Sequence, residues 1–127
     1  MRIAHEVTVG PARSIRGTIV VPGDKSISHR YALLAAIAEG TTTLRGYAPG
    51  GDCASTLACL RALGVDIERR EDHEHGPVVT INGCGGRPFV TPGAALDCGN
   101  SGSTMRMLSG LIAAHPITEP GECEPSS

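Results

Sequence analysis

The feature that most constrains this chain is a strongly apolar stretch, residues 31–38, that directly follows a short polar segment rich in Lys, Ser and Arg. Pro and Gly at residues 22–23 precede the pair and Gly40 follows it, so the pattern predicts a helix over about residues 27–39. Several polar residues from 24 to 28 are candidates for its N-cap. Because the helix is apolar nearly all round, we expect it to be buried inside a larger body.

The rest of the chain alternates between short β-branched runs and longer Ala- and Leu-rich runs, which is typical of an α/β (α+β) fold. The order β-α-β-α-β-β predicts one compact layered unit, and a second copy of that unit begins near residue 99 and is cut off after its first helix. Strands are predicted at residues 3–9, 17–21 (buried), 41–45, 65–69 and 78–81, and further helices at about 53–63 and 107–114.

Length and composition are those of one ordinary globular domain: 127 residues, 40% hydrophobic and 19% charged. Residues 1–115 are expected to form the folded portion. Residues 116–127 contain three prolines and three glutamates and no apolar pattern, so we expect a disordered tail there.

Charge and cysteine usage exclude several classes of function. The formal net charge of −2 offers no basic field for nucleic acid, and no apolar run approaches the ~20 residues that cross a bilayer. The five cysteines form no CxxC pair, so we expect reduced thiols, no metal site and a cytoplasmic protein. His73 and His75 are interpreted as part of a solvated hairpin tip, with metal binding the less favoured alternative.

The start of the first helix is predicted to bind an anion. A helix N-terminus presents unpaired N–H groups and the positive end of the helix dipole. Lys25 adds a charge there, Ser26 and Ser28 add hydroxyl donors, and Arg30 lies one turn after Ser26 on the same face. The alternative is that Ser26 only caps the helix while Lys25 and Arg30 are solvated.

The segment GNSGSTMR, residues 99–106, repeats this device. Asn100 or Ser101 can cap the helix, and Gly102 removes a side chain where a ligand could touch the backbone. Two hydroxyl residues follow, and Arg106 adds positive charge. Neither segment has the spacing of a Walker loop, of a dinucleotide GxGxxG motif or of a nucleophile elbow.

Residues 21–30 (VPGDKSISHR) and 96–108 (LDCGNSGSTMRML) resemble the two N-terminal signatures of the 5-enolpyruvylshikimate-3-phosphate synthase family. The likeness runs from about Ile3 to His115 and covers roughly the first third of a family member. It implies a two-domain fold built from β-α-β-α-β-β units, with the active site between the domains. It also implies transfer of the enolpyruvyl group of phosphoenolpyruvate to the 5-hydroxyl of shikimate 3-phosphate, with release of phosphate and no cofactor.

The resemblance also implies roles for residues of the first segment. Lys25 would contact both substrates, which makes it the one catalytic residue implied for this chain. Ser26 and Arg30 would hold shikimate 3-phosphate. The sibling family that acts on UDP-N-acetylglucosamine usually has Asn where Ser26 stands, so Ser26 and Arg30 favour the shikimate branch.

In the second segment, the resemblance implies that Gly102 lines the phosphoenolpyruvate pocket, where glyphosate also binds, and that Asn100 and Arg106 shape it. The carboxylates needed for acid and base chemistry lie well beyond residue 127 in the family. The partners expected are therefore the two small anionic substrates and the missing C-terminal portion of the enzyme. A non-catalytic anion-binding fragment and a nonfunctional truncated product remain the alternatives.

Overall fold

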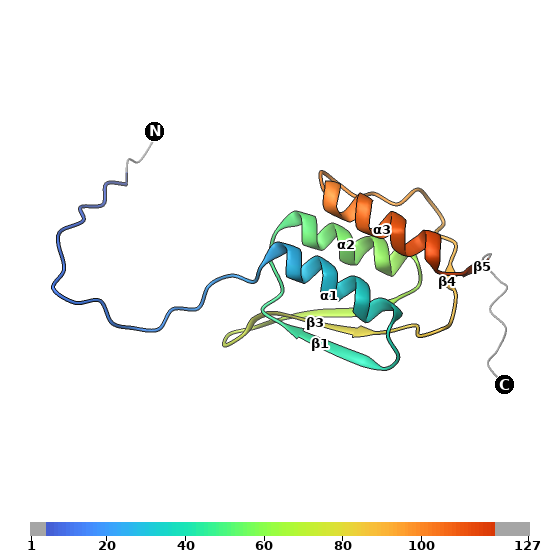
Figure 1. The fold of residues 1–127 in the computed structure, drawn as a ribbon, viewed down its shortest axis with the longest axis horizontal. Coiled ribbons are helices and arrows are strands. Elements are labelled where there is room, and N and C mark those ends of the chain that lie inside the picture. Colours follow the sequence, from blue (N-terminus) through green and yellow to red (C-terminus); the bar gives the residue numbers. More distant parts are fainter. Residues whose placement is uncertain (1–4, 119–127) are drawn as a thin grey trace.

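A computed structural model describes residues 5–118 of the chain. Helices α1 and α2 cover one face of a three-stranded sheet, and α3 packs on α1 and α2 on their side away from the sheet (Figure 1). The elements, in chain order, are α1 (Lys25–Ile37), β1 (Thr41–Arg45), α2 (Gly51–Ala62), β2 (Asp66–Asp72), β3 (Gly76–Asn82), β4 (Phe89–Val90), α3 (Gly102–Ala114) and β5 (Ile117–Thr118).

The sheet is antiparallel with the strand order β1-β3-β2, so β3 pairs on both sides. Its register places Leu44 and Arg69 opposite Val79, and Ile67 opposite Ile81. Strand β3 accordingly carries the most buried residues of the sheet, whereas every residue of β2 except Ile67 is charged. The predicted hairpin between these two strands is confirmed.

The tip of that hairpin is organised by Asp72, whose carboxylate accepts the backbone N–H groups of Glu74 and His75 at 2.7 and 3.1 Å. These two bonds hold the pKa of Asp72 below its usual range. Over residues 5–118, the structure contains no group of three side chains that could hold a metal ion, at this tip or elsewhere.

The core lies between the helices and the sheet and consists largely of Ala, Leu and Val, as the scarcity of aromatic residues predicts. Tyr47 and Phe89 are also buried, and the Tyr47 hydroxyl donates to the carbonyl of Cys53 at 2.9 Å. Burial raises the pKa of the Tyr47 phenol well above its usual range. This hydrogen bond ties the loop after β1 to the first turn of α2.

The prediction of strands at residues 3–9 and 17–21 is wrong for the residues that the structure describes. Residues 5–9 and 17–21 have no strand partner, and Ile19 and Val20 are 84% and 87% exposed. Both stretches run away from the body as an extended segment (Figure 1). A β-branched run becomes a strand only where a neighbouring backbone accepts its hydrogen bonds, and residues 5–118 offer it none.

The prediction that α1 is buried all round is also wrong. Its His29, Ala32 and Ala36 are fully buried against the rest of the fold. Tyr31 and Leu34, on the opposite face, are 54% and 61% exposed. The apolar surface of this helix is therefore larger than the surface that the described residues bury.

The second unit begins as predicted with α3, which packs against α2 and α1. After it, β5 pairs in parallel with β4, so ordered structure continues past the boundary predicted at residue 115. The rest of the predicted tail, residues 119–127, lies outside the described residues. None of the helices between residues 5 and 118 is long and apolar enough to span a membrane.

Candidate functional site

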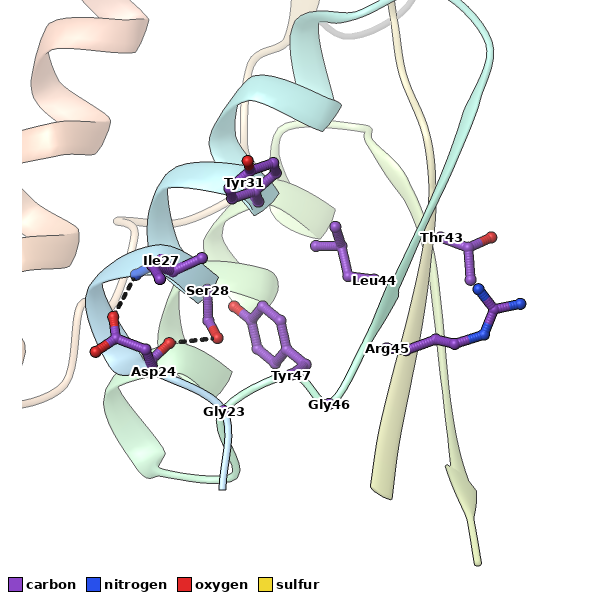
Figure 2. A pocket seen from close by; sticks show the side chains of 10 residues that line it. All are labelled: Gly23, Asp24, Ile27, Ser28, Tyr31, Thr43, Leu44, Arg45, Gly46 and Tyr47. Carbon is purple, nitrogen blue, oxygen red and sulfur yellow. Dashed lines mark hydrogen bonds between the residues drawn. The ribbon is translucent and has the colours of Figure 1, made fainter. Parts of the chain in front are cut away.

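The start of α1 is capped by Asp24, whose carboxylate accepts the backbone N–H of Ile27 at 2.8 Å (Figure 2). Because Asp24 caps the helix, the alternative in which Ser26 only serves as the cap is wrong. Ser28 does not present a free hydroxyl as predicted. It is 7% exposed, donates to the Asp24 carbonyl at 2.7 Å and accepts the N–H of Ala48 at 2.9 Å.

Lys25 lies in the first turn of α1 and forms an ion pair with Asp52 in the first turn of α2. The hydrogen bond and the negative charge of Asp52 raise the pKa of the Lys25 ammonium. Lys25 is therefore fully charged at neutral pH. The N-cap position of α2 is occupied by Gly50, so the Asp52 carboxylate in the first turn is free to partner Lys25.

Ser26 and Arg30 are exposed on the first two turns of α1. Within residues 5–118, neither side chain takes part in a hydrogen bond or an ion pair with the protein. A hydroxyl and a guanidinium left unbound beside a helix N-terminus are available to an anion.

The start of α3 is capped by Ser101, whose hydroxyl accepts the N–H of Thr104 at 3.0 Å. Gly102 is the first residue of the helix, and a Cβ at this position would meet no protein atom within 4 Å. Asn100, Ser103 and Arg106 are exposed around it. The backbone at Gly102 is thus open to a ligand, as predicted for a position without a side chain.

The three helices pack against one another and begin at the same end of the molecule (Figure 1). Buried polar contacts join them there: His29 Nδ1 lies 2.7 Å from Thr56 Oγ1, which lies 2.9 Å from Thr104 Oγ1. Burial and the charge of Lys25 lower the pKa of His29, which is therefore neutral at neutral pH. Two segments that are far apart in sequence, residues 25–30 and 100–106, are thereby placed on one surface.

His29 lies inside the segment identified from the sequence but was given no role there, and Thr56 was not identified. The available signal was weak: a histidine inside an apolar helix is more often a satisfied core residue than a functional one. Only the folded structure brings the imidazole to the hydroxyls of the two other helices.

A hollow of about 360 Å³ lies between α1 and β1 (Figure 2). Ile27, Tyr31 and Leu44 line it, together with Arg45 at its edge. None of the six site residues predicted from the sequence lines it. The predicted site residues therefore lie outside this hollow, although Asp24, Ile27 and Ser28 at the start of α1 line it.

The chain is similar to known proteins over most of its length. Residues 9–125 match the family model described as EPSP synthase (3-phosphoshikimate 1-carboxyvinyltransferase). The 3-phosphoshikimate 1-carboxyvinyltransferase of Herpetosiphon aurantiacus is 50% identical over 110 residues, which cover 87% of this chain and 24% of that protein. The enzyme of the same name from Koribacter versatilis is 49% identical over 111 residues, with 87% and 25% covered.

Among solved structures, EPSP synthase from Acinetobacter baumannii superposes with a TM-score of 0.68 at 43% sequence identity. The match covers 83% of this chain and 24% of that one. The chain thus spans about a quarter of the length of the relatives that it matches. The match to the family model, the sequence identities and the similarity of fold show that this chain belongs to the EPSP synthase family of carboxyvinyltransferases.

Proposed function

We propose that this chain provides the N-terminal part of a substrate site that transfers the enolpyruvyl group of phosphoenolpyruvate to the 5-hydroxyl of shikimate 3-phosphate. The main support for this proposal is that two helix starts, each with unbound polar side chains, lie at the same end of the molecule. Both substrates are small multivalent anions, and helix N-termini with adjacent cations suit such ligands.

At the start of α1, Arg30 is suited to grip the phosphate of shikimate 3-phosphate with two parallel N–H bonds, and the Ser26 hydroxyl adds a third donor. Lys25 has three N–H donors. Asp52 takes up one side of this ammonium, which leaves donors for ligands and holds the side chain in place. This supports the assignment of Lys25 as the group that contacts both substrates.

At the start of α3, we assign the phosphoenolpyruvate pocket to Gly102, with Asn100 and Arg106 shaping it. The open backbone at Gly102 supports this assignment, because a ligand can approach there without displacing any protein atom. Arg106 lies one turn further along the same helix and adds a positive charge.

Turnover requires an acid and a base as well as binding. Of the carboxylates at the helix starts, Asp24 caps α1 and Asp52 pairs with Lys25. We therefore propose that catalysis depends on the part of the enzyme that the relatives have beyond the quarter matched here. That part also supplies the strand partners for residues 17–21 and thereby completes the β-α-β-α-β-β unit.

Reconstitution tests this proposal. The chain is co-expressed with the non-overlapping three quarters of the Herpetosiphon aurantiacus relative, and phosphate release is followed with both substrates present. We expect turnover from the pair and none from the pair that carries Lys25→Ala. A well-folded complex of the two parts that releases no phosphate would contradict the proposal.

A second function, anion binding without turnover, is favoured by the engagement of Asp24 and Asp52 in structural contacts. The chain alone would then bind shikimate 3-phosphate weakly, because contacts from the rest of the cleft are missing. Calorimetry on the folded chain tests it, and an absence of heat at millimolar ligand rejects it. The names of the relatives support shikimate 3-phosphate over UDP-N-acetylglucosamine as the substrate.

A further inference from the structure

Three buried side chains form a continuous hydrogen-bond network that connects the three helices. His29 of α1, Thr56 of α2 and Thr104 of α3 are 0%, 0% and 1% exposed. His29 Nδ1 lies 2.7 Å from Thr56 Oγ1, and Thr56 Oγ1 lies 2.9 Å from Thr104 Oγ1. This hydrogen-bond network ends at Ser101, the cap of α3, whose hydroxyl lies 2.7 Å from that of Thr104.

One assignment of donors and acceptors agrees with all of these contacts. The Thr104 hydroxyl is placed to donate to Ser101 Oγ at 2.7 Å or to the Asp52 carbonyl at 3.3 Å, and a carbonyl oxygen can only accept. The Thr104 oxygen then accepts from Thr56, and Thr56 accepts from Nδ1–H of His29. The other ring nitrogen, Nε2, is buried and has no protein partner among the described residues.

Polar groups in a core are costly unless they are hydrogen-bonded. A network in which such groups bond to one another therefore favours a single placement of the three helices relative to each other. Apolar side chains alone would tolerate a small sliding of one helix along another. Here both ends of the hydrogen-bond network adjoin the proposed site, because His29 precedes Arg30 and Thr104 follows Ser103 in the sequence. A shift of either helix would therefore move the groups that face the ligands.

We propose that His29, Thr56 and Thr104 are positioning residues that set the start of α1 against the start of α3, so that a ligand touching both starts finds them correctly spaced. The proposal rests on the proposed function and deepens it. It distinguishes the two substrates. Phosphoenolpyruvate, assigned to Lys25 on α1 and Gly102 on α3, depends on the spacing, whereas shikimate 3-phosphate, assigned to α1 alone, does not.

Thr56→Val is the sharpest test because valine has the shape of threonine but cannot connect His29 to Thr104. Phosphoenolpyruvate is titrated by calorimetry into the full chain saturated with shikimate 3-phosphate. We expect its affinity to fall about tenfold in Thr56→Val, while the affinity for shikimate 3-phosphate changes less than about twofold. Thr56→Ser, which keeps the hydroxyl, should restore phosphoenolpyruvate binding.

Each other outcome decides against one of the two proposals. Unchanged phosphoenolpyruvate binding in a folded Thr56→Val, an equal loss of both substrates, or failure of serine to rescue would overturn the positioning role. If Thr56→Val does not fold, Thr104→Val interrupts the same hydrogen-bond network. The same two affinities are then measured and judged by the same criteria. A wild-type chain that is folded but binds neither substrate would overturn the proposed function, and one that binds only shikimate 3-phosphate would overturn the positioning role.

Discussion

At the scale of single residues, the starts of α1 and α3 each contain one residue that caps the helix and other polar residues that make no hydrogen bond within the described protein. Asp24 and Ser101 accept the orphan N–H groups of α1 and α3. This leaves Ser26 and Arg30 available beside the first start. The motifs predicted which residues belong to the two starts. They could not predict which hydroxyl is used internally, because the buried position of Ser28 depends on Ala48 from a distant loop.

Gly102→Ala tests the open backbone of α3. The added methyl group meets no protein atom within 4 Å, so the fold should tolerate it, but it occupies space that a ligand needs. We expect unchanged or slightly higher stability and an affinity for phosphoenolpyruvate lowered about tenfold. Calorimetry measures the affinity, with Gly110→Ala in the same helix as the matched control. Equal binding by both variants would contradict the assignment.

The neutral, buried His29 predicts a dependence of stability on pH. Burial and the charge of Lys25 lower its pKa below the ordinary value of 6.5, and the nearby Asp52 only partly offsets this. Below pH 6.5 the unfolded chain takes up a proton that the folded chain does not. The free energy of unfolding should therefore fall as the pH drops from 6.5 towards the folded pKa, by at most about 1.4 kcal/mol per pH unit.

Urea unfolding at pH 7.5 and pH 5.5 measures this loss, and His29→Asn provides the comparison. The variant should lose less stability over this interval than the wild type does. The same loss in both would show that His29 is not the group responsible.

At the scale of elements, the strands of the three-stranded sheet, whose partners lie within the described residues, were predicted correctly, and runs without a partner there were not. The runs at 41–45 and 78–81 pair with each other, and both predictions are confirmed. The run at 17–21 has equally good β-branched composition, yet it is extended and exposed. Composition states what a strand needs, whereas pairing depends on which backbone is present.

The junction after β3 depends on one close approach. Gly83 donates its N–H to the Gly40 carbonyl at 2.9 Å, and a Cβ on Gly83 would overlap the carbonyl oxygens of Ala35 and Ala38 at the end of α1. We expect Gly83→Ala to lower the free energy of unfolding by about 3 kcal/mol, because backbone must move to admit the methyl group. Gly86→Ala, which meets nothing within 4 Å, is the control in the same loop. Similar stabilities of the two variants in urea would contradict this packing.

At the scale of the whole molecule, the described chain exposes more apolar surface than a self-sufficient domain of this size should. Ile19 and Val20 on the extended segment and Tyr31 and Leu34 on α1 are all more than half exposed. Large apolar side chains exposed in this number are typical of a contact with another polypeptide. The match to about a quarter of each relative explains why such surface is present.

The purified chain should therefore self-associate. We expect an apparent mass above that of the monomer on sizing with light scattering, and a shift towards the monomer in the double variant Tyr31→Lys/Leu34→Lys, which places charges on the exposed face of α1. Thr43→Lys, also exposed, is the control for added charge alone. A sharp monomer of the wild-type chain would contradict this expectation.

The central claim is that the start of α1 binds shikimate 3-phosphate through Lys25, and calorimetric titration of the chain tests it most directly. We predict saturable binding that is lost in Lys25→Ala. Because this variant also breaks the ion pair with Asp52, Asp52→Asn is measured beside it. Asp52→Asn should keep the binding, since the ammonium remains and a competing carboxylate is gone. Equal affinity in the wild type and Lys25→Ala, or no heat from a well-folded wild-type chain, would contradict the claim.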